Sequence, residues 1–124
     1  MRVAIVGSRQ GVQSAAVERF VSVLGRKYPD SVVVSGGARG VDSWAVETAH
    51  IVGLLTEVFP AEWEKYGRSA GYRRNVQIVD AADIVVAFTT GSPGTRHTID
   101  IARAKGIPVY VFDADGLEVA QYNT

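Results

Sequence analysis

Short apolar runs alternate with stretches of helical periodicity along the whole chain. The runs fall at residues 2–6, 31–35, 54–59, 83–88 and 107–112, and the helical segments at 10–27, 40–52, 70–81 and 95–105. Most of the runs are continuously apolar, which is typical of strands that are buried on both faces of a parallel sheet. The pattern therefore predicts an α/β fold, a doubly wound, three-layer domain with a five-stranded parallel sheet.

The order of these strands follows from the handedness of their connections. Right-handed crossovers leave few topologies for such a sheet, and we expect the order 3-2-1-4-5. The winding reverses between strands one and four, and ligands of such sheets bind beyond the carboxyl ends of the strands at that point. Residues 60–69 are predicted to form an irregular polar loop, and the last dozen residues fit either a short helix or a tail.

Three glycine-rich turns follow strands whose carboxyl ends would meet at this edge. Each precedes a predicted helix, whose unpaired N–H groups and positive dipole end favour an anion. Glycine permits close backbone approach to a ligand, although a tight turn alone can also require it. The turns predict a cradle for a phosphate or a ribose phosphate. Its candidate residues are Gly7, Ser8, Arg9, Ser35, Gly36, Gly37, Arg39, Gly40, Thr89, Gly94 and Thr95.

Further candidates lie outside these turns, and each has two interpretations. Arg73, Arg74 and Asn75 form either a solvated charged turn or a segment from which one arginine reaches across the cleft. Asp42 either favours the positive end of its helix or accepts a hydrogen bond from a ribose hydroxyl or from Arg39. Residues Trp63 and Tyr66 either stack on a base as a lid or pack between surface and core.

Composition narrows the class of ligand. The net charge is zero, yet the chain has ten arginines against three lysines, which favours a small anionic ligand over a long polyanion. There is no cysteine, and the two histidines have no partners at metal-ligand spacing, so neither a metal nor a cofactor is expected. No apolar run reaches membrane-spanning length, and the N-terminus resembles a strand more than a signal peptide. We expect one cytoplasmic domain over residues 1–124, without membrane contact.

Four stretches together resemble the YspA-like branch of the SLOG superfamily. They are "VAIVGSR", "VVVSGGARGVDSWAVETA", "FPAEWEKYGRSAGYRRNVQIVDAADIVVAF" and "GTRHTIDIARAKGIPV", which match in order and spacing. The resemblance implies a Rossmann-like domain that binds a nucleotide or a nucleotide-derived ligand such as AMP or ADP-ribose. The family's motif positions fall here on Gly7, Ser8, Arg9, Gly36, Gly37, Gly40, Asp42, Arg74, Asn75, Gly94 and Thr95.

Two related families imply competing functions. "SGGARGVD" is similar to a motif of the DNA-processing protein A family, which binds single-stranded DNA, but this chain is shorter and has no net positive charge. The LOG family cleaves the N-glycosidic bond of nucleoside monophosphates, with a catalytic glutamate three residues after an arginine. Here Arg74 matches that arginine, whereas the glutamate position falls on Gln77, which cannot activate water. A binding domain is therefore favoured over an enzyme, and a homo-oligomer is compatible with the sequence.

Overall fold

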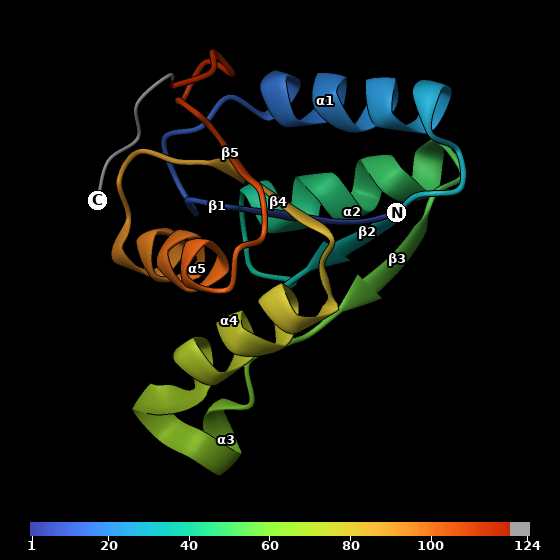
Figure 1. The fold of residues 1–124 in the computed structure, drawn as a ribbon. Helices are drawn as coiled ribbons and strands as arrows, with labels where there is room; N and C mark the ends of the chain where they lie inside the picture. The colour runs from blue at the N-terminus through green and yellow to red at the C-terminus, as the bar shows by residue number, and fades with distance from the viewer. Residues whose placement is uncertain (120–124) are drawn as a thin grey trace.

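The computed structural model describes residues 1–119, which fold into one parallel sheet with helices on both faces (Figure 1). The strands are β1 (Arg2–Gly7), β2 (Val32–Ser35), β3 (Leu55–Val58), β4 (Ile84–Phe88) and β5 (Val109–Phe112). The helices are α1 (Ser14–Lys27), α2 (Val41–Ile51), α3 (Trp63–Tyr66), α4 (Ala70–Ala81) and α5 (Pro93–Ala104), with the 3-10 turn η1 (Gly67–Ser69) between α3 and α4.

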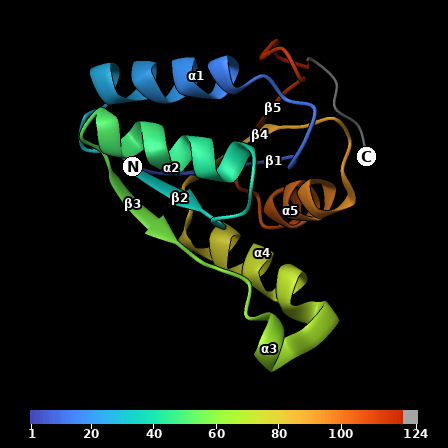
Figure 2. The same ribbon diagram turned by 180° about the vertical axis from the view of Figure 1, so that it is seen from behind.

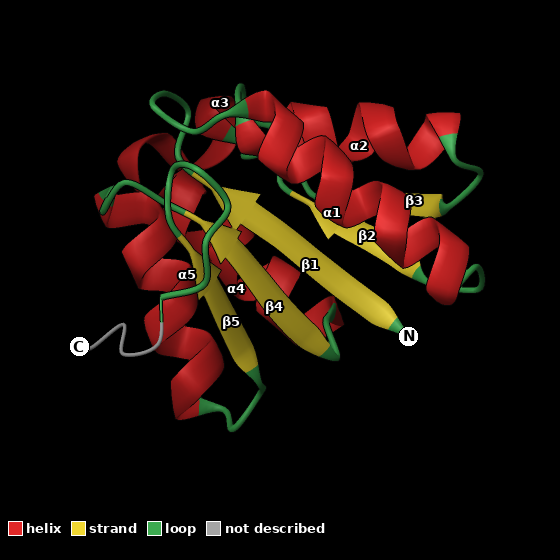
Figure 3. Ribbon diagram, turned by 90° about the horizontal axis from the view of Figure 1, so that it is seen from above, coloured by secondary structure: helices red, strands yellow, loops and turns green. Residues whose placement is uncertain are grey.

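The sheet has the predicted strand order, β3-β2-β1-β4-β5, and all its strands are parallel. The register places Val3 beside both Val33 and Ile84, so β1 is the central strand and the winding reverses between it and β4. Figure 3 shows the strand arrows pointing to one edge of the sheet. The predicted fold class and topology are confirmed.

Helices cover both faces of the sheet (Figures 1 and 2), and an apolar core lies between the helices and the sheet on each face. One face packs against α1 and α2, with Val17, Val21 and Ala45 among the fully buried side chains. The other face packs against α4 and α5, whose Ile78 and Ile99 are buried against the sheet. Alternate residues of β1 supply both cores, which explains why this strand is apolar throughout its length. Trp44 is partly buried and packs against the first cluster.

Some predicted boundaries are wrong, each for a local reason. Helix α1 begins at Ser14 rather than near Gln10, because residues 8–13 form a loop in which Gly11 has a φ of 86°. Residues 63–69 are helical rather than irregular, but α3 is a single turn and has no buried face. Residues 113–119 form a turn that returns to β5, where Glu118 bridges Phe112. The prediction for residues 120–124 lies outside the described residues.

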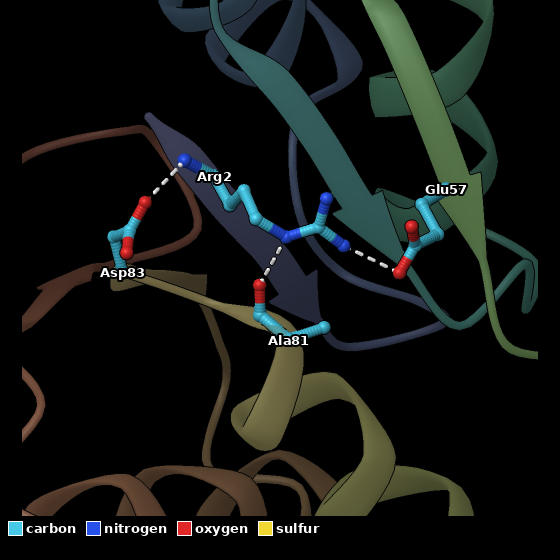
Figure 4. Close-up of polar contacts among 4 residues, drawn as sticks. All are labelled: Arg2, Glu57, Ala81 and Asp83. Atoms are coloured by element: carbon cyan, nitrogen blue, oxygen red, sulfur yellow. Dashed lines mark hydrogen bonds and ion pairs between the residues drawn. The ribbon is translucent and has the colours of Figure 1, made fainter.

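Arg2 links three elements at the amino edge of the sheet (Figure 4). Its backbone N–H donates to Asp83, its Nε donates to the carbonyl of Ala81, and its Nη2 pairs with Glu57 of β3. The carbonyl of Ala81 lies at the C-terminal end of α4, where helix carbonyls lack intrahelical partners and a cation is favourable. This contact holds the C-terminal end of α4, the helix that carries Arg74 and Asn75 near its middle. Among residues 1–119, no helix combines the length and apolar character needed to cross a membrane.

Candidate functional site

The first glycine-rich turn comprises residues 7–9, and packing requires its glycine. A Cβ atom on Gly7 would lie 2.2 Å from the carbonyl oxygen of Phe88 and 2.6 Å from Cγ2 of Val41. The glycine therefore lets β4 and the start of α2 approach the end of β1. Because α1 begins seven residues later, no residue of α1 lines the pocket described below. The expectation that this turn brings a helix N-terminus to the site is wrong.

The second glycine-rich turn, residues 35–40, packs against the side chain of Arg74. Its Nη1 donates to the carbonyl of Gly36 at 2.7 Å, and a Cβ on Gly36 would lie 2.4 Å from that same nitrogen. Two other glycines of the turn, Gly37 and Gly40, adopt φ angles of 69° and 77° that other residues rarely adopt. Ser35 closes the turn, since its hydroxyl accepts from the N–H of Gly37. The glycines here serve the contact with α4 and the backbone path.

Asp42 lies buried beneath this turn, 6% exposed, and accepts a hydrogen bond from the N–H of Ala38 at 3.3 Å. Burial raises the pKa of Asp42 to about 6, against the opposing effects of the Ala38 hydrogen bond and the Arg74 guanidinium. Burial likewise lowers the pKa of Arg74, while Asp42 opposes that change. The Nε of Arg74 is buried and has no hydrogen-bond partner among the described residues. The arginines that act electrostatically on Asp42 are Arg74 and Arg9, and no hydrogen bond or ion pair joins Asp42 to Arg39 within residues 1–119.

Several hydroxyl groups lie close to Ser8, where the third glycine-rich turn, residues 89–95, contacts the first. The Oγ of Ser8 accepts from the N–H and the hydroxyl of Thr90, at 3.0 and 3.2 Å, and lies 3.1 Å from the Oγ of Ser92. Ser92 donates in turn to the hydroxyl of Thr95 at 2.9 Å. The hydroxyl of Thr89 lies 3.4 Å from the Oγ of Ser8 and also accepts from the N–H of Gly91. This chain of hydroxyls ends at Thr95, in the first turn of α5.

Helix α5 begins at this cluster with Pro93 as its first residue. The N–H groups of Gly94 and Thr95 therefore have no intrahelical acceptor. A Cβ on Gly94 would meet no atom within 4 Å, and its φ is not positive, so neither packing nor backbone conformation requires glycine there. Asn75 donates from Nδ2 to the carbonyl of Gly94 at 3.2 Å and lies 3.1 Å from Nδ1 of His97, which fixes α4 against α5.

These elements enclose a pocket of about 640 Å³ at the carboxyl edge of the sheet, between the ends of β1, α2, α4 and α5. Within the described residues, its charged lining consists of Arg9, Arg39, Arg68 and Arg74 against the single carboxylate of Asp42. No hydrogen bond or ion pair joins the side chains of Arg9, Arg39 or Arg68 to another residue of the range 1–119. The arrangement suits an anion.

The pocket gathers most of the residues predicted from sequence. The predicted residues in its lining are Gly7, Ser8, Arg9, Arg39, Asp42, Trp63, Arg74, Asn75, Gly94 and Thr95. The predicted residues outside the lining are Ser35, Gly36, Gly37, Gly40 and Thr89, which shape the turns behind it. Of the arginine pair, Arg74 reaches the pocket, whereas Arg73 lies over the Tyr66 ring, 4.3 Å from its centroid.

Sequence reasoning missed other lining residues, among them Arg68, Tyr72, Ser92 and Thr98. Arg68 carried a signal, since it lies in the polar stretch before α4, but its direction depends on how η1 packs. Gln77, which occupies the position of the LOG catalytic glutamate, lies on α4 beside a smaller hollow of about 370 Å³ with Pro60 and Val76. Within residues 1–119, no group of three or more His, Asp or Glu side chains is placed to hold a metal ion.

Comparison with known proteins agrees with this architecture. The chain is 38% identical over 120 residues to the Gene 61 protein of Mycobacterium phage D29, covering 90% of this chain and 95% of that protein. Among solved structures it is similar to DNA processing protein A from Streptococcus pneumoniae, with a TM-score of 0.71 and 23% identity over 90% of this chain and 50% of that one. The chain thus spans half the length of that protein.

Two further structures share the fold. One is a structural-genomics target, TM1055, with a TM-score of 0.73 and 22% identity, covering 87% of this chain and 71% of that chain. The other is DNA processing protein A from Helicobacter pylori, described by its single-stranded DNA binding mode, with a TM-score of 0.67 and 22% identity over 94% and 69% of the two chains. A sequence model of the YspA, cpYpsA-related SLOG family matches residues 1–66. The chain belongs to the YspA, cpYpsA-related SLOG family.

Proposed function

We propose that this chain binds a nucleotide or a nucleotide-derived small molecule, such as AMP or ADP-ribose, with its phosphate in the pocket at the carboxyl edge of the sheet. The observation that carries the proposal is the charge of the lining, four guanidinium groups against one carboxylate. Arginine presents planar, bidentate donors to phosphate. Within residues 1–119, no hydrogen bond or ion pair engages three of these guanidinium groups, those of Arg9, Arg39 and Arg68.

The N-terminus of α5 supports the same position for the phosphate. The N–H groups of Gly94 and Thr95 and the hydroxyl of Thr95 converge there, and Gly94 leaves open the space that a side chain would fill. Helix N-termini of this kind stabilise anions through their N–H groups and dipole. In this proposal Gly7, Ser8 and Thr95 line the phosphate site, while Arg9, Arg39 and Arg74 neutralise it.

Isothermal titration with AMP, ADP, ADP-ribose and NAD tests the proposal. Arg39→Ala should weaken binding of the tightest of these compounds by roughly tenfold or more, since a hydrogen bond to a charged group contributes about 1.5–3 kcal/mol. Arg73→Ala is the matched control, because Arg73 is equally charged but lies outside the pocket. Saturable binding that Arg39→Ala weakens and Arg73→Ala leaves unchanged would support the proposal. Equal effects of the two variants would place the phosphate elsewhere.

Asp42 favours a second candidate, hydrolysis of the N-glycosidic bond of the bound nucleotide. A buried carboxyl with a pKa raised to about 6 is suited to proton transfer near neutral pH. Gln77 lies away from the pocket, so Asp42 is the carboxyl of the described lining that could act. Free base appearing in the titration mixtures, and disappearing with Asp42→Asn, would establish this activity.

A further inference from the structure

The pocket is larger than a phosphate requires, and its rim is aromatic. Trp63 of α3 and Tyr72 of α4 both line it, and both side chains are about half exposed, at 52% and 53%. Inside, the apolar side chains of Val6 and Ile78 reach the lining beside the arginines. The site therefore combines cationic side chains with an aromatic rim, and a phosphate ion alone would fill only part of it.

The two aromatic residues of α3 differ in what already covers them. The Tyr66 ring carries the Arg73 guanidinium 4.3 Å from its centroid and the Lys65 ammonium at 5.1 Å, and it lies outside the main pocket. The Trp63 ring has neither an aromatic nor a cationic neighbour of this kind among the described residues. Of the pair, Trp63 is the one that lines the pocket, with a ring that carries no such neighbour.

Helix α4 fixes the position of the Trp63 indole. A Cβ on Gly71 would lie 3.3 Å from Cη2 of Trp63, so the ring lies directly against the helix backbone at that point. Glycine is otherwise unfavourable within a helix. Gly71 belongs to the same helix as Arg74 and also lines the pocket. The indole that packs on Gly71 therefore lies at the mouth of the pocket.

We infer that Trp63 stacks on the base of the ligand, which makes the ligand a nucleotide in the strict sense and not a sugar phosphate. The inference rests on the proposed function, because the phosphate end of the pocket must anchor the molecule whose base reaches Trp63. Base–aromatic stacking tolerates any base, since every base has a π-face. Trp63 therefore selects for the presence of a base, and the arginines select for the phosphate.

The comparison of AMP with ribose 5-phosphate tests this inference, because the two share the ribose and the phosphate and differ in the base. We expect AMP to bind at least about tenfold more tightly. Trp63→Leu should lower AMP affinity to the level of ribose 5-phosphate and leave ribose 5-phosphate unchanged, and Trp63→Phe should retain most of the preference. Tyr66→Leu, in the same helix but outside the pocket, is the matched control.

Fluorescence gives a second readout that is independent of affinity. The chain has two tryptophans, and Trp44 packs away from the pocket against the α1–α2 core. In a Trp44→Phe background Trp63 is the sole indole, and AMP should quench it while ribose 5-phosphate should not.

Each other outcome has a distinct meaning. Equal affinities for the two compounds, or AMP binding unchanged in Trp63→Leu, would overturn the stacking and leave phosphate binding standing. If neither compound nor ADP-ribose binds, the proposed function fails and the inference fails with it. Binding that requires an oligonucleotide of several residues would overturn the inference in favour of a nucleic-acid track.

Discussion

Asp42 is a carboxyl group whose protonation changes when the chain folds. Its pKa rises from 3.8 to about 6 because burial disfavours the charged form. Between about pH 4 and pH 6 the folded protein therefore holds a proton that the unfolded chain has released. The contribution of Asp42 to the free energy of unfolding is largest below about pH 4 and is lost as the pH rises through about 6.

Asp42→Asn isolates this effect, since asparagine keeps an oxygen that can accept from Ala38 and does not titrate. The free energy of unfolding of the wild type, minus that of the variant, should fall by up to about 3 kcal/mol between pH 4 and pH 7. Urea unfolding of both proteins at several pH values in this range measures the difference. A difference that stays constant with pH would mean that Asp42 titrates normally.

Gly94 belongs to the first turn of α5, where glycine stabilises the helix less than alanine would. Because a Cβ there meets nothing within 4 Å, Gly94→Ala should raise the free energy of unfolding by about 0.5–1 kcal/mol. The same methyl group would occupy the space proposed for the phosphate, so affinity for AMP should fall. Thermal unfolding and titration of one variant test both effects. Pro93→Ala, which alters the helix start outside the pocket, is the control, and a more stable variant with full affinity would contradict the proposal.

At the level of elements, hydrophobic periodicity predicts the helices and strands that bury apolar residues. It misses the features that depend on how one element packs against another. The long helices and the strands other than β3 were predictable because each buries apolar residues, as Ile99 and Ala102 of α5 do, whereas β3 has no fully buried residue. Helix α3 was not predictable, since a single exposed turn has no such face. Likewise, Gly36 and Gly94 both follow a strand in sequence, yet Gly36 is crowded by Arg74 while Gly94 faces open space. Only the packing of α4 distinguishes the structural glycine from the candidate binding one.

The chain as a whole carries no net charge, so the excess of positive charge in the pocket lining is local to one edge of the sheet. In our proposal a small nucleotide contacts only the pocket arginines, whereas a DNA strand would need cations along a longer path. The slope of log affinity against log salt reports how many phosphates are neutralised, at about 0.7 per phosphate for a single strand. Binding of ADP-ribose should therefore weaken only modestly between about 50 and 200 mM salt, with a slope no steeper than about −2.

Oligothymidylates of increasing length provide the comparison for this prediction. Two of the structural neighbours are DNA processing proteins, and that of Helicobacter pylori is described as binding single-stranded DNA. If this chain works as a small-ligand domain, affinity for the oligonucleotides should not grow with length, because the described pocket arginines are satisfied by one or two phosphates. Affinity that increases with each added nucleotide, together with a steep salt slope, would mean that the pocket arginines bind single-stranded DNA instead.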